Sequence, residues 1–308
     1  MKATVPMNKL PWCPGSCLPL VLLLLLPMLA RAGGKDVDFS NYDKPLYEQV
    51  VEHIQQKVAA RIGNATHKED RYFIVPFAYE DEDNKPQLSH SFMTVIRVFG
   101  QGGGPSRSSV FRTGKYKQWS FEAFTISWLP HDFAENPNLC VFDGFGSRII
   151  PSWNKCALSV GKSFDLAATL KLAEQARLAV GIWGPYEITK AGFDTAVQRL
   201  RLLQGGTIKY RADDRLYRKD RVAINCFHAM AGLEDLFPNG GLFGTGFKMW
   251  GLNGTRRVLI EYNARGREKG LLLEEADPKN DLHGFVYAAE PGGRPSFNPF
   301  QHASAYRK

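Results

Sequence analysis

Apolar positions in the first half of the chain follow a helical spacing and then an alternating one. Over 45–62 they recur every three or four residues, which predicts a helix. Segments 71–79, 88–99 and 116–128 are rich in β-branched and aromatic residues and predict three strands. The Gly/Ser-rich stretch 100–109 is interpreted as a hairpin connection between the second and third of these strands.

Helical spacing returns in the second half of the chain. It predicts a helix over 163–181 with Ser163 as its N-cap, and another over 191–204. Short runs of β-formers predict strands over 207–210 and 257–262. Strands followed by helices and then by further short strands are typical of the α+β class, in which an antiparallel sheet packs against helices.

The N-terminal segment has the three parts of an export signal. Two lysines precede an apolar run over 18–30, and Ala30-Arg31-Ala32 is a small-residue cleavage site. The run is shorter than the about 20 residues that a spanning helix needs. We therefore expect a cleaved signal peptide over 1–32 and an exported protein, periplasmic or secreted, without a transmembrane segment. The alternative is an uncleaved membrane anchor.

The rest of the chain is expected to form one domain. Residues 33–290 would be a single α+β domain of catalytic type, with an insertion at about 130–204 that contains the helices. The segment 291–308 is polar and contains Gly and Pro, which predicts a C-terminal tail.

Signal cleavage changes the cysteine count. It removes 32 of the 308 residues and two of the five cysteines, which leaves Cys140, Cys156 and Cys226. Three cysteines in an oxidising compartment need an explanation. Cys140 and Cys156 flank a Gly/Pro-rich stretch and are predicted to form a disulfide, with two buried thiols as the alternative. If that bridge forms, Cys226 remains a thiol.

Composition and motifs exclude several classes of protein. A hydrophobic content of 44% and an aromatic content of 12% exclude a disordered chain. Cleavage also removes three basic residues, so the formal charge falls from +8 to +5, and this dispersed charge does not indicate nucleic acid. The chain has neither C-x-x-C nor H-E-x-x-H, and 100–109 lacks the third glycine and the helix of a dinucleotide site. We expect no metal and no cofactor.

The strongest local signal for chemistry is Asn225-Cys226, at the start of a predicted helix over 225–236. Asn is a good N-cap, which would place Cys226 in the first helical turn. There the backbone N–H groups that lack intrahelical partners favour a thiolate and would bind a developing oxyanion. Cys226 is therefore the candidate nucleophile, and Asn225 is the candidate residue for the cap and the oxyanion site.

A thiolate needs a base, and His90 is the candidate. It falls on the mostly apolar face of strand 88–99, whereas His228 is only two residues from Cys226 and would not face it on a helix. Glu122, on the following strand, is the candidate for orienting the imidazole. The alternatives are a core histidine at position 90, a salt bridge at position 122, and His131 as a reserve base.

These residues resemble a known arrangement. A strand histidine, a polar residue on the next strand and a much later Asn-Cys at a helix start are similar to the circularly permuted papain-like thiol enzymes of the NlpC-type superfamily, including lecithin:retinol acyltransferase-like proteins. The Asn-Cys-Glu-His-Phe motif of that group is matched at Asn225, Cys226 and His228 but not at Phe227 and Ala229. The resemblance implies a permuted papain-like core with Cys226 as nucleophile and His90 as base. That group also has a second histidine shortly after the first, which this chain lacks.

Two functional hypotheses follow. The first is an exported cysteine hydrolase or acyltransferase that acts on an amide or ester bond, with a cell-envelope peptide or lipid as substrate and with Trp183 and Tyr186 lining the substrate cleft. The second is a non-catalytic exported binding or structural protein that retains the fold.

Overall fold

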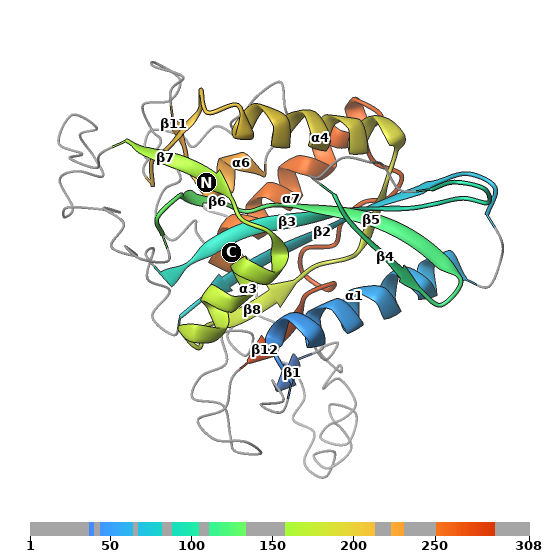
Figure 1. The fold of residues 1–308 in the computed structure, drawn as a ribbon, viewed down its shortest axis with the longest axis horizontal. Coiled ribbons are helices and arrows are strands. Elements are labelled where there is room, and N and C mark those ends of the chain that lie inside the picture. Colours follow the sequence, from blue (N-terminus) through green and yellow to red (C-terminus); the bar gives the residue numbers. More distant parts are fainter. Residues whose placement is uncertain are drawn as a thin grey trace, which may run out of the picture. The chain divides into compact units, whose positions relative to one another are not determined.

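The described residues from 37 to 286 belong to one compact unit, drawn in Figure 1. The signal peptide over 1–32, Cys140, Cys156 and the tail over 291–308 lie outside the described residues. The computed structural model describes residues 37–39, 44–63, 67–81, 88–104, 111–133, 158–212, 223–230 and 251–286.

The larger sheet is mostly antiparallel, and its strands do not follow chain order. The order is β1-β12-β8-β2-β3-β5-β4, and β9 also pairs with β2. β1 and β12 pair in parallel, whereas β2, β3 and β5 are antiparallel neighbours. The strands of this sheet are β1 (Val37–Phe39), β2 (Arg71–Glu80), β3 (His90–Val98), β4 (Arg112–Tyr116), β5 (Trp119–Ile126), β8 (Ala179–Ile182), β9 (Tyr186–Ile188) and β12 (His283–Val286).

A smaller sheet continues from the larger one at Ser127. The chain leaves β5 at Ile126 and enters β6 at Trp128, so Ser127 is the residue at which it passes from one sheet to the other. The order of the smaller sheet is β11-β10-β7-β6. Its strands are β6 (Trp128–Pro130), β7 (Ser159–Ser163), β10 (Lys209–Tyr210) and β11 (Ala223–Ile224).

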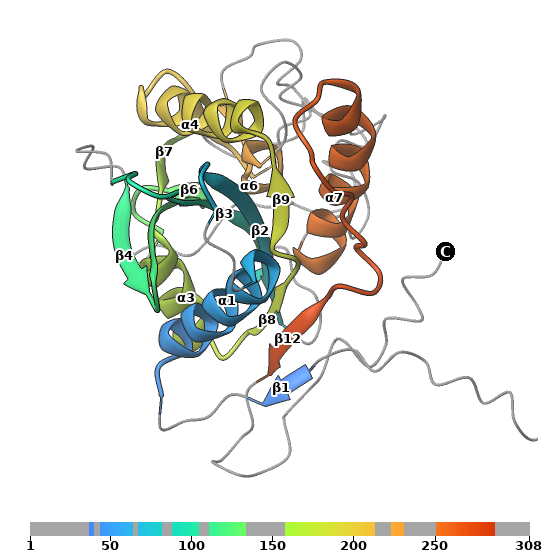
Figure 2. The ribbon, with the colours of Figure 1, turned by 90° about the vertical axis from the view of Figure 1, so that its right-hand side faces the viewer.

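Helices cover both faces of the larger sheet, as Figure 2 shows. α1 and α3 bury their apolar sides against one face, where Phe73, Phe77 and Phe92 form the core. α4, α6 and α7 pack on the other face against Met93 and Phe124, among others. The bounds are α1 (Leu46–Ile62), α3 (Leu166–Gln175), α4 (Lys190–Gln204), α6 (Cys226–Ala229) and α7 (Gly251–Glu268). The protein is therefore a mixed α+β protein with an antiparallel sheet between helices.

The alternation predicted for β3 is confirmed, and it divides the core into two halves. Phe92, Ile96 and Val98 belong to the cluster beneath α1 and α3, whereas Met93 and Val95 belong to the opposite cluster. Because side chains alternate along a strand, His90 falls on the same face as Phe92.

Three predictions, about strand order, about the type of one element and about the length of another, are wrong. The stretch after β3 does not close a simple hairpin, because β4 forms an outer strand and β5 then inserts between β3 and β4. Residues 257–262 belong to α7, whose buried residues Leu252, Thr255 and Leu259 follow a helical spacing. The predicted helix over 163–181 is shorter, because α3 ends at Gln175 and β8 follows.

The segment 130–204 is not an insertion outside the core. β8 pairs with both β2 and β12, and β9 pairs with β2. α3 begins after Asp165, whose side chain accepts a hydrogen bond from the Ala168 backbone N–H at 2.8 Å, so Asp165 and not Ser163 is the N-cap. This segment therefore supplies strands and helices on which the larger sheet depends.

Among the helices that the structure describes, none combines the length and the apolar character that crossing a membrane requires.

Candidate active site

Cys226 is the first residue of α6, as the sequence predicts. Asn225 has extended backbone angles, and its side-chain oxygen accepts a hydrogen bond from the His228 backbone N–H at 3.0 Å. The Asn225 amide group in turn donates to the Ala212 carbonyl at 3.2 Å, which ties the cap to the chain after β10. The predicted N-cap is therefore confirmed. With four residues, α6 offers first-turn N–H groups but only a small helix dipole.

His90 begins β3 and lies in a closed aromatic environment. It is 1% exposed, and its register partner on β2 is Tyr79. The imidazole centroid is 5.3 Å from the Tyr79 ring and 5.4 Å from the Phe92 ring. Burial in this apolar surrounding lowers the pKa of His90 to about 3, because the charged form loses its hydration. The imidazole is therefore neutral at pH 7.

A chain of hydroxyl groups holds one nitrogen of His90. Nε2 lies 2.9 Å from Ser127 Oγ, and this hydroxyl lies 2.8 Å from Thr169 Oγ1 of α3. Thr169 Oγ1 is also 2.8 Å from the backbone oxygen of Asp165. Ser127 and Thr169 are both fully buried, so these contacts are shielded from water. This series of hydroxyl groups holds the imidazole of His90 in one orientation from the side of α3.

The other nitrogen of His90, Nδ1, has no hydrogen-bond partner in the part of the chain that the structure describes. The Cys226 thiol is therefore not hydrogen-bonded to it. A buried imidazole nitrogen without a hydrogen-bond partner lowers the stability of the folded protein.

Packing brings α6 to the end of β3 at which His90 lies. α6 contacts both β3 and β6. Burial raises the pKa of Tyr79, and the charge of a Cys226 thiolate raises it further. Cys226 is half-buried, whereas His90 and Tyr79 are closed off. The structure thus brings Cys226 within electrostatic reach of Tyr79, the register partner of His90.

Glu122 does not orient His90. It pairs with Arg97 in the β3–β5 register, and its carboxylate accepts a hydrogen bond from Arg97 at 3.1 Å. Arg97 is seven positions beyond His90, which corresponds to roughly 20 Å along a strand. Glu122 lies in the middle of β5, whereas Ser127 follows the end of that strand. The salt-bridge alternative for Glu122 is therefore confirmed, and Ser127 is the partner of His90.

Trp183 and Tyr186 do not line a cleft. Each is 1% exposed and belongs to the core beneath α4 and α7. The Trp183 indole N–H donates to the Pro278 carbonyl at 3.1 Å, which ties β8 to the segment before β12. These aromatic residues stabilise the packing between the sheet and the C-terminal helix.

The reserve histidine is remote from this arrangement. The His131 side chain is 56% exposed and lies 3.7 Å from the Asp132 carboxylate. Over the described residues, no group of three or more His, Cys, Asp or Glu side chains is placed to hold a metal ion.

Sequence reasoning missed Tyr79, Ser127 and Thr169. A hydroxyl residue in a strand or a helix carries no distinctive spacing, and its role here depends on α3 packing over the junction between the two sheets. That Tyr79 lies opposite His90 follows only from the register between β2 and β3. A register of this kind follows from the loop that joins two strands and from their buried faces.

Comparisons with known proteins do not extend this description: no protein-family model matches the chain, and neither curated proteins nor solved structures give a match.

Proposed function

We propose that this protein is an exported cysteine hydrolase or acyltransferase with a permuted papain-like core. One observation carries the proposal. A half-buried thiol at a capped helix start lies within electrostatic reach of Tyr79, the register partner of a buried histidine that has one nitrogen anchored and the other without a hydrogen-bond partner. An anchored base beside a thiol is the arrangement that nucleophilic catalysis needs.

The hydroxyl chain favours the tautomer in which Nδ1 is the base. A carbonyl only accepts, so the Asp165 contact uses the single hydroxyl hydrogen of Thr169. Since Thr169 has a single hydroxyl hydrogen, we assign the hydrogen between the two hydroxyls to Ser127, whose oxygen then accepts the N–H of His90 Nε2. This assignment leaves a lone pair on Nδ1, the atom that has no partner.

The proposed reaction has two halves. Substrate binding brings Cys226 Sγ to His90 Nδ1, which takes the thiol proton, and the thiolate attacks an amide or ester carbonyl. The first-turn N–H groups of α6 stabilise the oxyanion. The intermediate collapses to a thioester, and the leaving amine or alcohol takes the proton from Nδ1. Water then releases the acid in a hydrolase, or an amine or alcohol accepts the acyl group in a transferase. In each case Nδ1 takes the proton of the acceptor and Cys226 regains it.

Burial makes His90 a weak base, since its pKa is about 3. A thiolate beside the imidazole would favour the protonated ring, so the pair is expected to form only when both side chains meet. This coupling makes the chemistry dependent on substrate binding.

A reactivity measurement tests the proposal. Labelling by a p-nitrophenyl ester, which occupies the site as a substrate does, is followed by mass spectrometry of the peptide that contains Cys226, which separates it from the other cysteines. We expect His90→Gln to slow this labelling of Cys226 at least tenfold at pH 7.5. His131→Gln, which changes an exposed histidine, is the matched control and should leave the rate unchanged.

The bond formed in this labelling tests the chemistry itself. We expect a hydroxylamine-sensitive acyl group on Cys226 and none on the Cys226→Ala variant. Equal labelling of the native protein and His90→Gln, or no hydroxylamine-sensitive acyl group on Cys226, would leave the proposal without support.

The second candidate is a non-catalytic exported binding protein. The observation that favours it is the missing hydrogen bond between the thiol and Nδ1. It predicts slow labelling of Cys226 that does not depend on His90.

A further inference from the structure

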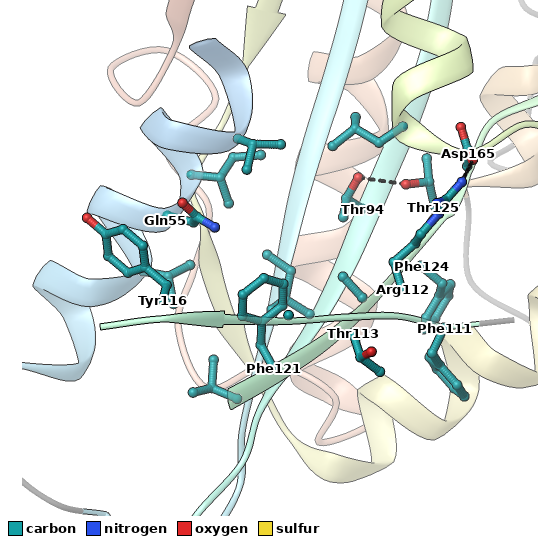
Figure 3. A pocket seen from close by; sticks show the side chains of 18 of the residues that line it. Gln55, Thr94, Phe111, Arg112, Thr113, Tyr116, Phe121, Phe124, Thr125 and Asp165 are labelled. Carbon is teal, nitrogen blue, oxygen red and sulfur yellow. Dashed lines mark hydrogen bonds and ion pairs between the residues drawn. The ribbon is translucent and has the colours of Figure 1, made fainter. Parts of the chain in front are cut away.

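A large cavity lies between α1 and the sheet, along the part of β3 from Thr94 to Val98, away from His90. Its volume is about 860 Å³, and its walls come from α1, β3, β4, β5, the start of α3 and, at Leu200 and Gln204, the end of α4. Figure 3 shows Gln55 and Tyr116 on one side of it, and Arg112 and Asp165 on the other. This volume falls within the range of roughly 300–1,000 Å³ that is typical of small-molecule sites.

The interior of the cavity is largely apolar. α1 contributes Val51, Ile54 and Val58, and the facing strands contribute Ile96 and Ala123 among other residues. Two threonines lie deeper on the sheet, and their hydroxyl groups form a hydrogen bond to each other, with 3.0 Å between Thr94 Oγ1 and Thr125 Oγ1 (Figure 3). An occupant of the interior therefore needs apolar surface and no charge.

Charge is confined to the side chains that reach solvent. The charged residues among the lining residues are Arg112, Lys115 and Asp165. Arg112 pairs with Asp165, and this carboxylate also caps α3. Lys115 is exposed on the edge strand β4. The balance at the rim is therefore one positive charge, which favours a negatively charged group there.

We infer that this cavity binds the single aliphatic chain of an anionic amphiphile, with the chain between α1 and the sheet and the anionic group at Arg112 and Lys115. This inference does not rest on the chemistry proposed for Cys226. Phe92 is fully buried on β3 between His90 and Thr94, so it separates His90 from the cavity-lining residues of that strand.

A chain-length series tests the apolar part. Binding of alkyl carboxylates from eight to eighteen carbons is measured by calorimetry below their micelle concentrations. Burial of one methylene is worth about 0.8 kcal/mol, so affinity should rise roughly fourfold per carbon until the cavity is full and then level off. Affinity that does not change with length would overturn the inference.

Two pairs of variants test the location. Ala123→Phe fills the cavity and should weaken binding of the longest tight ligand at least tenfold. Ala191→Phe adds the same ring on the exposed side of α4 and should not weaken it. Thermal unfolding first establishes that both variants fold. If Ala123→Phe is folded and binds like the native protein, the chain does not occupy this cavity.

The head group is tested at the rim. Lys115→Gln combined with Arg112→Gln should weaken binding of alkyl carboxylates and alkyl phosphates about tenfold and leave the matching alcohols unchanged. Lys171→Gln, on α3 outside the lining, is the control. Carboxylates and phosphates that bind with different affinities would identify the source of the anion. Equal binding of alkyl carboxylates and alkyl ammonium ions would overturn the anionic assignment.

Discussion

The buried imidazole of His90 is expected to make the stability of this protein depend on pH. His90 keeps a pKa of about 3 in the folded protein, against about 6.5 in an unfolded chain. Below pH 6.5 the unfolded chain therefore binds a proton that the folded protein does not bind. The free energy of unfolding falls as the pH falls, and the contribution of His90 is complete only above about pH 6.5.

The magnitude follows from the two pKa values. Between pH 7.5 and pH 5 the lost stability is about 2 kcal/mol, and between pH 7.5 and pH 3 it is about 4 kcal/mol. The titratable neighbours do not compensate at acid pH, because the Tyr79 phenol has a raised pKa and a thiol is neutral there. Carboxylates elsewhere also titrate in this range, so the measurement must be a difference between variants.

Urea unfolding of the native protein and of His90→Gln at pH 7.5, 6 and 5 provides that difference. The stability of the native protein relative to the variant should fall by about 2 kcal/mol from pH 7.5 to pH 5. His131→Gln, the exposed control, should show no such change. A difference that stays constant over this range, or that grows in favour of the native protein at acid pH, would refute the reasoning.

Other substitutions have expected effects that follow from single contacts. Ser127→Ala leaves Nε2 of His90 buried without its hydroxyl partner and should destabilise the protein by about 1–3 kcal/mol in urea unfolding. A Cβ at Gly161 would lie 1.9 Å from the ring of the buried Trp128, so Gly161→Ala should cost at least about 1–3 kcal/mol and alter the near-ultraviolet circular dichroism. Gly104→Ala, where a Cβ meets nothing within 4 Å, should stay within about 0.5 kcal/mol of the native protein.

Predictions that depend on local spacing agree well with the structure. The helix predicted over 45–62 is α1, which ends at Gly63 with a φ of 71°, a value that a glycine adopts without strain. Asn225 caps α6 as expected because an N-cap depends on only a few consecutive residues.

Predictions that depend on partners distant in sequence agree less well. The run Val258-Leu259-Ile260 favours a strand by propensity, yet it lies in α7, which packs on the sheet and begins where the Glu80 carboxylate accepts the Leu252 backbone N–H at 2.9 Å. Burial of the helical face against β2 outweighs a local preference that is worth at most about 1 kcal/mol.

The same distinction between local spacing and distant partners applies to the candidate site. The sequence by itself determined that Cys226 begins a capped helix and that His90 shares a face with Phe92, because caps and strand alternation are properties of neighbouring residues. Only the tertiary structure decided that Ser127 and not Glu122 holds the imidazole, and that α6 packs against β3 and β6. Strand order, register and the docking of α3 are set by which apolar faces are buried together, and the spacing within one segment does not contain that information.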